Sequence, residues 1–324
     1  MSGLLPRRRF IAAGTAAVAG CSRRVDPPRT SSHSSDLPRV SVIRQAAYTQ
    51  DIYETVRRTL ALHQLKVRGK NIVLKPNLVE FEAGSVINTN PILVHAALEA
   101  FRGMGAATVR IAEGPGHRRG TLDLAEAAGY FDIIPGFEDL FTDLNLDDVS
   151  RVELTNPASR LRSLYLPHTA LSCDLLVSMP KMKTHHWAVA TLSMKNLFGV
   201  VPGGVYGWPK NVLHWAGIAE CISDLHKVFP GTFALVDGVT GMEGNGPIQG
   251  TARNAGIIVA GRDSVAVDAT CCRLMGINPL KVEYLRLSRQ DARLAESSIT
   301  QTGESIAGSN QQFSLLPQFN SCRL

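Results

Sequence analysis

The sequence alternates short apolar runs with segments of helical periodicity, and this alternation limits the possible folds most strongly. Residues 71–75 form an apolar run that Pro76 ends, and residues 91–105 then place apolar side chains at helical spacing. A second apolar run follows at residues 108–112. A strand, a helix and another strand in this order indicate two parallel strands, so the pattern predicts an α/β protein.

The second half of the chain continues the same kind of pattern. The expected elements are a strand at 175–179, a helix at 212–229, strands at 233–236 and 256–260, and a buried helix at 263–275. We therefore expect parallel or mixed sheets flanked by helices, arranged as two α/β lobes with a cleft between them. The polar segment 295–324 predicts an edge strand and a tail, and we place the end of the α/β domain, residues 39–310, before a tail at 311–324.

The first 38 residues have the composition of a targeting segment and a tether. Residues 1–21 contain three arginines before Phe10 and then a short, weakly apolar run that ends at Cys21. The arginine pair resembles a twin-arginine export motif, and the end of the run resembles a bacterial lipobox. Residues 22–38 are rich in Ser, Pro and Arg, as flexible tethers are.

These features predict an exported bacterial protein, periplasmic or at the cell surface. The twin-arginine export machinery would recognise the signal peptide, and a lipidated Cys21 would anchor the mature lipoprotein in the membrane. The alternative is a basic tail without a signal function. No run of about 20 apolar residues occurs, so a transmembrane helix is not predicted.

Charge and motif content exclude several function classes. The formal net charge is +6, and subtracting the three arginines at positions 7–9 leaves about +3, which is too little to indicate nucleic-acid binding. The sequence has no Gly-x-Gly-x-x-Gly motif, no Walker loop and no Cys-x-x-Cys pair. It therefore has no signature for NAD, ATP or an iron–sulfur cluster. Cys271 and Cys272 lie in an apolar run and are predicted to be core thiols.

The segment 180–214 is densely basic. It contains four lysines and three histidines but no aspartate or glutamate, and aromatic residues lie between the basic ones. Surface segments normally mix both signs of charge, so this segment favours a pocket for a carboxylate or phosphate over a solvated basic face. Ligands of open α/β sheets bind beyond the carboxyl ends of the strands. We therefore expect the loops at 75–77, 113–120 and 237–250 to converge with this segment.

Three histidines and one lysine are the candidates for chemistry. His117, His185 and His214 lie in these segments, and histidine can transfer protons or bind metal ions near neutral pH. The alternative for each is a structural role. Lys195 lies among apolar residues, which lower the pKa of an amine and so make it a better nucleophile or base. The alternative is a surface lysine whose ammonium group reaches water.

Several motifs occur in a fixed order along the chain. They are Lys75-Pro76-Asn77, Glu113-Gly114, residues 180–185, Lys195 to Gly199, Asp237-Gly238, Gly244 to Gly250 and Asp263 to Asp268. Together they resemble the family catalogued as domain of unknown function 362 (DUF362), from about residue 39 to about residue 310.

A second resemblance concerns the chemistry. The sequence Gly116-His117-Arg118, the spacing of ten positions from His185 to Lys195, and the path from Pro202-Gly203 to His214 resemble the nickel-dependent lactate racemase family. This resemblance implies that His117 and His185 transfer protons, that Lys195 holds a nickel-pincer nucleotide covalently, and that His214 ligates the nickel.

Together these expectations give one leading hypothesis and two alternatives. The leading hypothesis is an exported α/β protein that binds a small anionic carboxylate and acts on it as a racemase- or epimerase-like isomerase with a cofactor or metal ion. Lys75, Arg118 and Lys183 are the expected anion-binding residues. The first alternative is a cell-surface protein that captures an anionic or metal-bound ligand without turnover. The second is a redox protein, against which the missing cysteine spacing argues.

Overall fold

The fold is built around one large mixed sheet. The computed structural model describes residues 37–117, 120–288 and 294–324. The strand order is β12-β1-β11-β10-β7-β2-β3-β4, and β8 and β9 are attached to this path through β10. The strands are β1 (Arg39–Arg44), β2 (Asn71–Pro76), β3 (Thr108–Glu113), β4 (Phe141–Asp143), β7 (Leu175–Met179), β8 (Lys181–His185), β9 (Val189–Thr191), β10 (Phe233–Glu243), β11 (Thr251–Gly261) and β12 (Thr300–Gly303), with β5 (Val149–Glu153) and β6 (Ser163–Pro167) in a separate hairpin.

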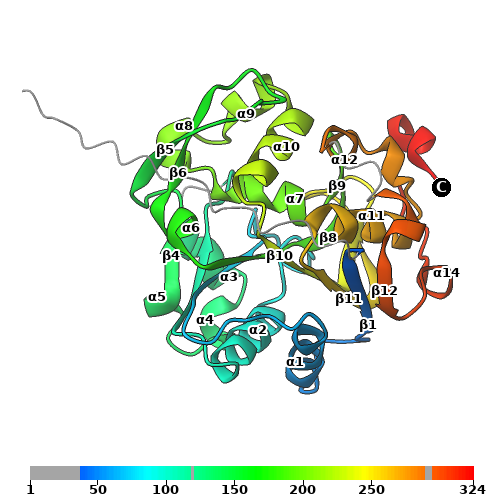
Figure 1. The fold of residues 1–324 in the computed structure, drawn as a ribbon, viewed down its shortest axis with the longest axis horizontal. Helices are drawn as coiled ribbons and strands as arrows, with labels where there is room; N and C mark the ends of the chain where they lie inside the picture. Colours follow the sequence, from blue (N-terminus) through cyan, green and yellow to red (C-terminus); the bar gives the residue numbers. More distant parts are fainter. Residues whose placement is uncertain (1–36, 118–119, 289–293) are drawn as a thin grey trace, which may run out of the picture.

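Helices cover both faces of this sheet (Figure 1). The α-helices are α1 (Ile52–Leu62), α2 (Pro91–Gly103), α3 (Thr121–Ala127), α4 (Tyr130–Ile133), α5 (Phe137–Leu140), α6 (His168–Ser172), α7 (Ser193–Asn196), α8 (Gly203–Tyr206), α9 (Asn211–Trp215), α10 (Ile218–Val228), α11 (Ser264–Leu274), α12 (Glu283–Leu287) and α14 (Ile306–Ser309). The 3-10 helices are η1 (Leu197–Val200), η2 (Pro279–Lys281), η3 (Glu296–Ser298) and η4 (Pro317–Cys322).

The two faces of the sheet form two hydrophobic cores. Helices α1 and α2 pack on one face, whereas α7, α10 and α11 pack on the other. In β2, Val73 points into the second core while Ile72 and Leu74 point into the first, as the two-residue period of a strand requires. Both faces are covered, so the strands are nearly continuous apolar runs rather than alternating ones. The α/β class with a mixed sheet flanked by helices is confirmed, and the strands predicted in both halves of the chain belong to this one sheet.

Most elements lie where their patterns predict them. The strand at 175–179 matches β7 in full, and Asp263 caps α11 by accepting a hydrogen bond from the backbone N–H of Ala266 at 3.0 Å. Helix α11 is buried along its whole length, and Cys271 and Cys272 are core thiols as predicted. The prediction of a single helix at 212–229 is wrong. Gly217, at φ 106°, separates α9 from α10.

The end of the chain packs against the domain. The predicted edge strand is β12, which pairs in parallel with β1. Phe313 is fully buried, and Arg323 forms an isolated bridge with Ile277, so residues 311–324 are not a free tail. The expected signal peptide lies outside the described residues, as does nearly all of the expected tether. Among the residues that the structure describes, no helix has both the length and the apolar character needed to cross a membrane.

Candidate functional site

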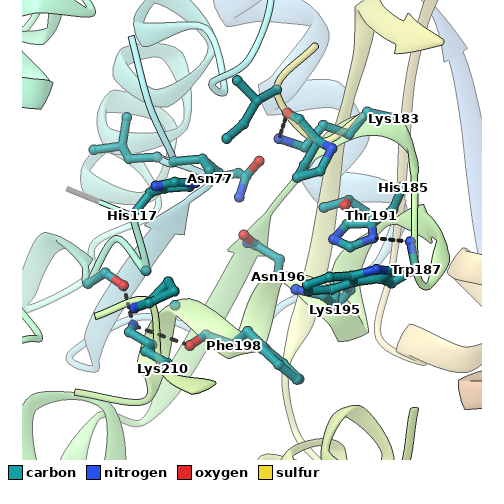
Figure 2. A pocket seen from close by; sticks show the side chains of 18 of the residues that line it. Asn77, His117, Lys183, His185, Trp187, Thr191, Lys195, Asn196, Phe198 and Lys210 are labelled. Carbon is teal, nitrogen blue, oxygen red and sulfur yellow. Dashed lines mark hydrogen bonds between the residues drawn. The ribbon is translucent and has the colours of Figure 1, made fainter. Parts of the chain in front are cut away.

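A pocket of about 230 Å³ lies at the carboxyl edge of the sheet. It is lined by the ends of β2 and β3, by β8 and the segment through α7, by residues 209–214, and by Pro247 and Ile248 in the loop between β10 and β11. Figure 2 shows side chains from these segments pointing into one cavity. The loops that the sequence predicts to converge do come together here.

A buried ion pair lies beneath the pocket. Lys75 Nζ lies 2.6 Å from Glu113 Oε2, and both side chains are shielded from solvent. Lys75 Nζ also donates to the side-chain oxygen of Asn196 at 3.2 Å, and Asn196 donates back to the Lys75 carbonyl at 3.1 Å. These bonds join the end of β2 to α7. Lys75 therefore has an internal partner, and it is not among the residues that line the pocket.

Two lysines of the pocket are held by backbone carbonyl groups. Lys183 Nζ donates to the carbonyls of Ile87 at 2.9 Å and Pro247 at 3.2 Å, and Lys210 Nζ donates to Gly114 O at 2.5 Å. Burial lowers the pKa of Lys183 well below its usual value, with neighbouring lysines adding to the effect. Burial also lowers the pKa of Lys210 to about 7.

Lys195 differs from these lysines because its amine has no hydrogen bond or ion pair with any described residue. Its Nζ lies 4.0 Å from the centroid of the Phe198 ring, an apolar surface that interacts with a cation but accepts no proton. Burial lowers the pKa of Lys195 to about 7, and the positive charge of Lys75 contributes. Near neutral pH the amine is thus divided between its charged and free forms.

Three further polar groups that line the pocket lack hydrogen-bond partners. The side-chain oxygens of Asn77 and Thr191 and the Nδ1 atom of His214 are buried and make no hydrogen bond with the described residues. Asn77 follows β2, and Thr191 ends β9. Buried polar groups are normally satisfied by a partner, so three such groups at one cavity indicate a ligand that supplies the missing bonds.

His185 is held in one tautomer by the turn that follows β8. Its Nδ1 accepts hydrogen bonds from the backbone N–H groups of Trp187 at 3.0 Å and Ala188 at 3.1 Å. Burial lowers its pKa well below the usual value, and the charge of Lys195 contributes. The neutral ring therefore carries its proton on Nε2 and can donate it in a hydrogen bond. This arrangement favours a role as hydrogen-bond donor, whereas the resemblance implies that His185 transfers protons.

The other histidines line the outer part of the pocket. His117 is exposed at the opening, and in Figure 2 it lies across the cavity from Lys195. His214 is half-buried and packs edge to face against Trp187, with ring centroids 5.1 Å apart. Burial lowers the pKa of His214, and Lys195 contributes. His186, to which no role was assigned, also lines the pocket.

Asp268 of the buried helix α11 positions the short helix that carries Lys195. Its carboxylate accepts hydrogen bonds from the Ser193 N–H at 2.8 Å, the Ser193 hydroxyl at 2.5 Å and the Met194 N–H at 3.1 Å. These are the free N–H groups at the start of α7, which a carboxylate satisfies well. Asp268 thus fixes α7, and with it Lys195 and Asn196, at the wall of the pocket.

The structure brings together most of the predicted site residues. His117, Lys183, His185, Lys195 and His214 all line the pocket, whereas Arg118 lies outside the described residues. Sequence reasoning assigned no role to the pocket residues Asn77, Thr191 and Lys210. All three belong to segments that the sequence singled out, but nothing in the sequence marks Thr191 itself.

Comparison with known proteins places the chain in a family. The model of the family described as "Domain of unknown function (DUF362)" matches residues 72–273, which is more than half of the chain. The chain belongs to the DUF362 family. The DUF362 match runs from β2 through α11, so it includes every segment that lines the pocket.

One curated protein similar to this DUF362 chain is the thylakoid-associated protein sll1697 of Synechocystis sp. It is 26% identical over 259 residues, which cover 75% of this chain and 76% of the relative. Among solved structures, the lactate racemase apoprotein of Thermoanaerobacterium thermosaccharolyticum has 17% identity and a TM-score of 0.45, covering 74% of this chain and 57% of the racemase chain. A Thermotoga maritima protein has 12% identity and a TM-score of 0.38, covering 76% of this chain and 60% of its own.

Proposed function

We propose that the pocket binds a small carboxylate and moves a proton at the carbon atom next to it, as a racemase or epimerase does. The observation that carries this proposal is the set of polar groups around one cavity that have no hydrogen-bond partner among the described residues. They are the side-chain oxygens of Asn77 and Thr191 and the Nδ1 atom of His214, together with Lys195 Nζ, which lies over the Phe198 ring.

A carboxylate offers acceptors for the Thr191 hydroxyl and the Nε2–H of His185. The Asn77 oxygen needs a donor instead, which the hydroxyl group of a 2-hydroxy acid supplies. The basic surroundings, with Lys183 and Lys210, favour a negative charge.

Lys195 and His117 are the proposed proton-transfer groups. The Lys195 amine, with a pKa of about 7, has the free form that takes a proton and the charged form that returns one. When the proton moves to the Lys195 amine, the electron pair of the C–H bond adds a second negative charge to the carboxylate oxygens, which the hydrogen-bond donors of the pocket stabilise. His117, across the cavity in Figure 2, then delivers a proton to the opposite face of the carbon atom.

The proposal is tested by hydrogen exchange with solvent. The chain is incubated in D₂O with lactate and with 3-phenyllactate, and the loss of the proton signal at carbon 2 is followed by NMR. We expect exchange that Lys195→Met abolishes and that His117→Gln removes from one enantiomer only. Binding of both acids without any exchange would contradict the proton transfer and favour the alternative, a protein that captures the anion without turnover.

Lys195 and His214 also suit the cofactor that the racemase resemblance implies. Among the described residues, no group of three or more His, Cys, Asp or Glu side chains could hold a metal ion, so a metal here would need ligands from the cofactor itself. The lowered pKa of His214 keeps the ring neutral, which is the form that ligates metals. In this second candidate function Lys195 is no longer a base, because its amine would attach the nickel-pincer nucleotide covalently. His214 would ligate the nickel, which would supply Lewis-acid chemistry when bound.

We further propose that the chain is exported and anchored as a lipoprotein, as residues 1–38 suggest. Fractionation of cells that express the full chain tests this. Replacing both Arg8 and Arg9 by Lys should keep the protein in the cytoplasm. Cys21→Ser should release exported protein from the membrane fraction. A membrane-bound Cys21→Ser variant would contradict the lipid anchor.

A further inference from the structure

The pocket has a polar interior and an apolar opening. Lys183, His185 and Thr191 lie inside and are at most 5% exposed. The opening is surrounded by apolar side chains that remain partly or largely in contact with water: Val79, Trp187, Pro209, Pro247 and Ile248. A single exposed apolar residue is common on protein surfaces, but several of them around one opening indicate a surface that a ligand covers.

These apolar residues come from four separate segments. Val79 follows β2, Trp187 lies in the turn between β8 and β9, Pro209 precedes α9, and Pro247 and Ile248 lie in the loop between β10 and β11. The fold thus collects apolar side chains at one place although they are far apart in the sequence. Accidental exposure within a single loop does not explain this distribution.

Trp187 is the largest of these side chains and is 60% exposed. Its ring packs edge to face against His186 at 4.7 Å and His214 at 5.1 Å between centroids. The indole is therefore supported from two sides while most of its surface stays in water. A fixed aromatic ring at a pocket opening loses this exposure when an apolar part of a ligand packs against it.

We infer that the ligand is a carboxylate that carries an aromatic or branched apolar group. This inference rests on the proposed function, because the polar interior is what binds the carboxylate. The apolar group would lie at the opening against Trp187 and Ile248. A lactate-sized acid satisfies the interior but leaves the opening exposed. The pocket volume of about 230 Å³ is below the roughly 300–1,000 Å³ of sites for drug-sized molecules, so one ring or branched chain is the size that fits.

Calorimetric titration of the full chain with three matched probes tests the inference. The probes are lactate, 3-phenyllactate and 3-phenyl-1,2-propanediol, which lacks the carboxylate. We expect 3-phenyllactate to bind roughly tenfold or more tightly than lactate, because burying a phenyl group raises the affinity by about this factor. The diol should bind far more weakly than 3-phenyllactate.

A pair of variants tests whether the preference for 3-phenyllactate over lactate arises at the opening of the pocket. Ile248→Ser should reduce the ratio of the two acid affinities several-fold. Leu280→Ser serves as the control, because Leu280 is a 56% exposed leucine that does not line the pocket. In this control the ratio should equal that of the unmodified protein.

The outcomes separate this inference from the proposed function. Equal affinities for lactate and 3-phenyllactate would overturn the inference and leave the carboxylate site standing. A ratio that Ile248→Ser does not change would also overturn it. Failure of both acids to bind would overturn the proposed function itself, and so would a diol that binds as tightly as 3-phenyllactate.

Discussion

Gly199 lies so close to Glu113 that a Cβ atom at this position would overlap the Glu113 carboxylate oxygen. The same Cβ would lie 2.5 Å from Lys75 Nζ. Gly199 therefore provides the space in which the buried ion pair forms, and η1 can pass directly above the pair only because this residue has no side chain.

Replacing Gly199 by Ala should therefore destabilise the protein. The methyl group would separate Lys75 from Glu113, and disruption of a buried pair costs about 3–5 kcal/mol. Urea denaturation followed by circular dichroism measures the change. Gly231→Ala is the control, because a Cβ there meets no atom within 4 Å, and it should change the free energy of unfolding by less than about 1 kcal/mol. Similar stabilities for both variants would contradict the crowding at Gly199.

Binding of a carboxylate should take up protons from the solvent above pH 7. Burial lowers the pKa values of Lys195 and Lys210 to about 7, so at pH 8 both amines are mostly uncharged. A bound anion favours their charged forms and raises both pKa values, so each lysine gains a fraction of a proton. At pH 5.5 both lysines are already charged, and the uptake from them should vanish.

Calorimetry of 3-phenyllactate binding measures this uptake in pairs of buffers that differ in ionisation enthalpy, HEPES and Tris at pH 8 and MES and Bis-Tris at pH 5.5. The Lys195→Met variant should show less uptake at pH 8, since one of these two lysines is absent. Proton release at pH 8, or uptake that persists unchanged at pH 5.5, would show that other groups titrate.

Asp268→Asn should loosen α7. The oxygen of an asparagine can still accept the two hydrogen bonds from Ser193, but its NH₂ group would face the Met194 N–H. A buried donor would then lack a partner, which costs about 1–3 kcal/mol of folding free energy. The rate at which Lys195 is reductively methylated, followed by mass spectrometry against pH, should shift in this variant. Asp263→Asn is a matched control, because asparagine can still accept the bond from Ala266. A Lys195 profile that stays the same in both variants would contradict a positioning role for Asp268.

Protein purified from its native host should show whether Lys195 holds a cofactor. A nickel-pincer nucleotide would give stoichiometric nickel in elemental analysis and added mass on the peptide that contains Lys195. The Lys195→Met variant should lose both signals and stay folded, because Lys195 has no hydrogen bond with another described residue. An unmodified peptide without nickel would remove this cofactor from the proposal.

Local patterns predict the elements of this fold well, but long-range contacts decide the roles within the site. The strand at 175–179 and the buried helix at 263–275 follow from apolar periodicity. Lys75 is different, because its partner Glu113 lies 38 positions away and only the pairing of β2 with β3 brings them together.

His185 and Thr191 show the same limit. The sequence marks His185 as a candidate, yet its tautomer depends on two N–H groups of the turn after β8. Thr191 gains its importance only because no neighbour satisfies its hydroxyl, and a missing contact leaves no pattern in the sequence. The break at Gly217 was visible as a glycine, but apolar spacing continues across it.

The pocket residues extend from Asn77 to Ile248 along the chain. During synthesis, a ribosome-bound chain therefore has no complete site until the loop between β10 and β11 has emerged and docked. A ligand present in the cell then cannot guide the early steps of folding, and it stabilises only the finished domain by mass action. If the ligand or cofactor is acquired in the cytoplasm, its loading has to wait until translation has passed the last of these segments.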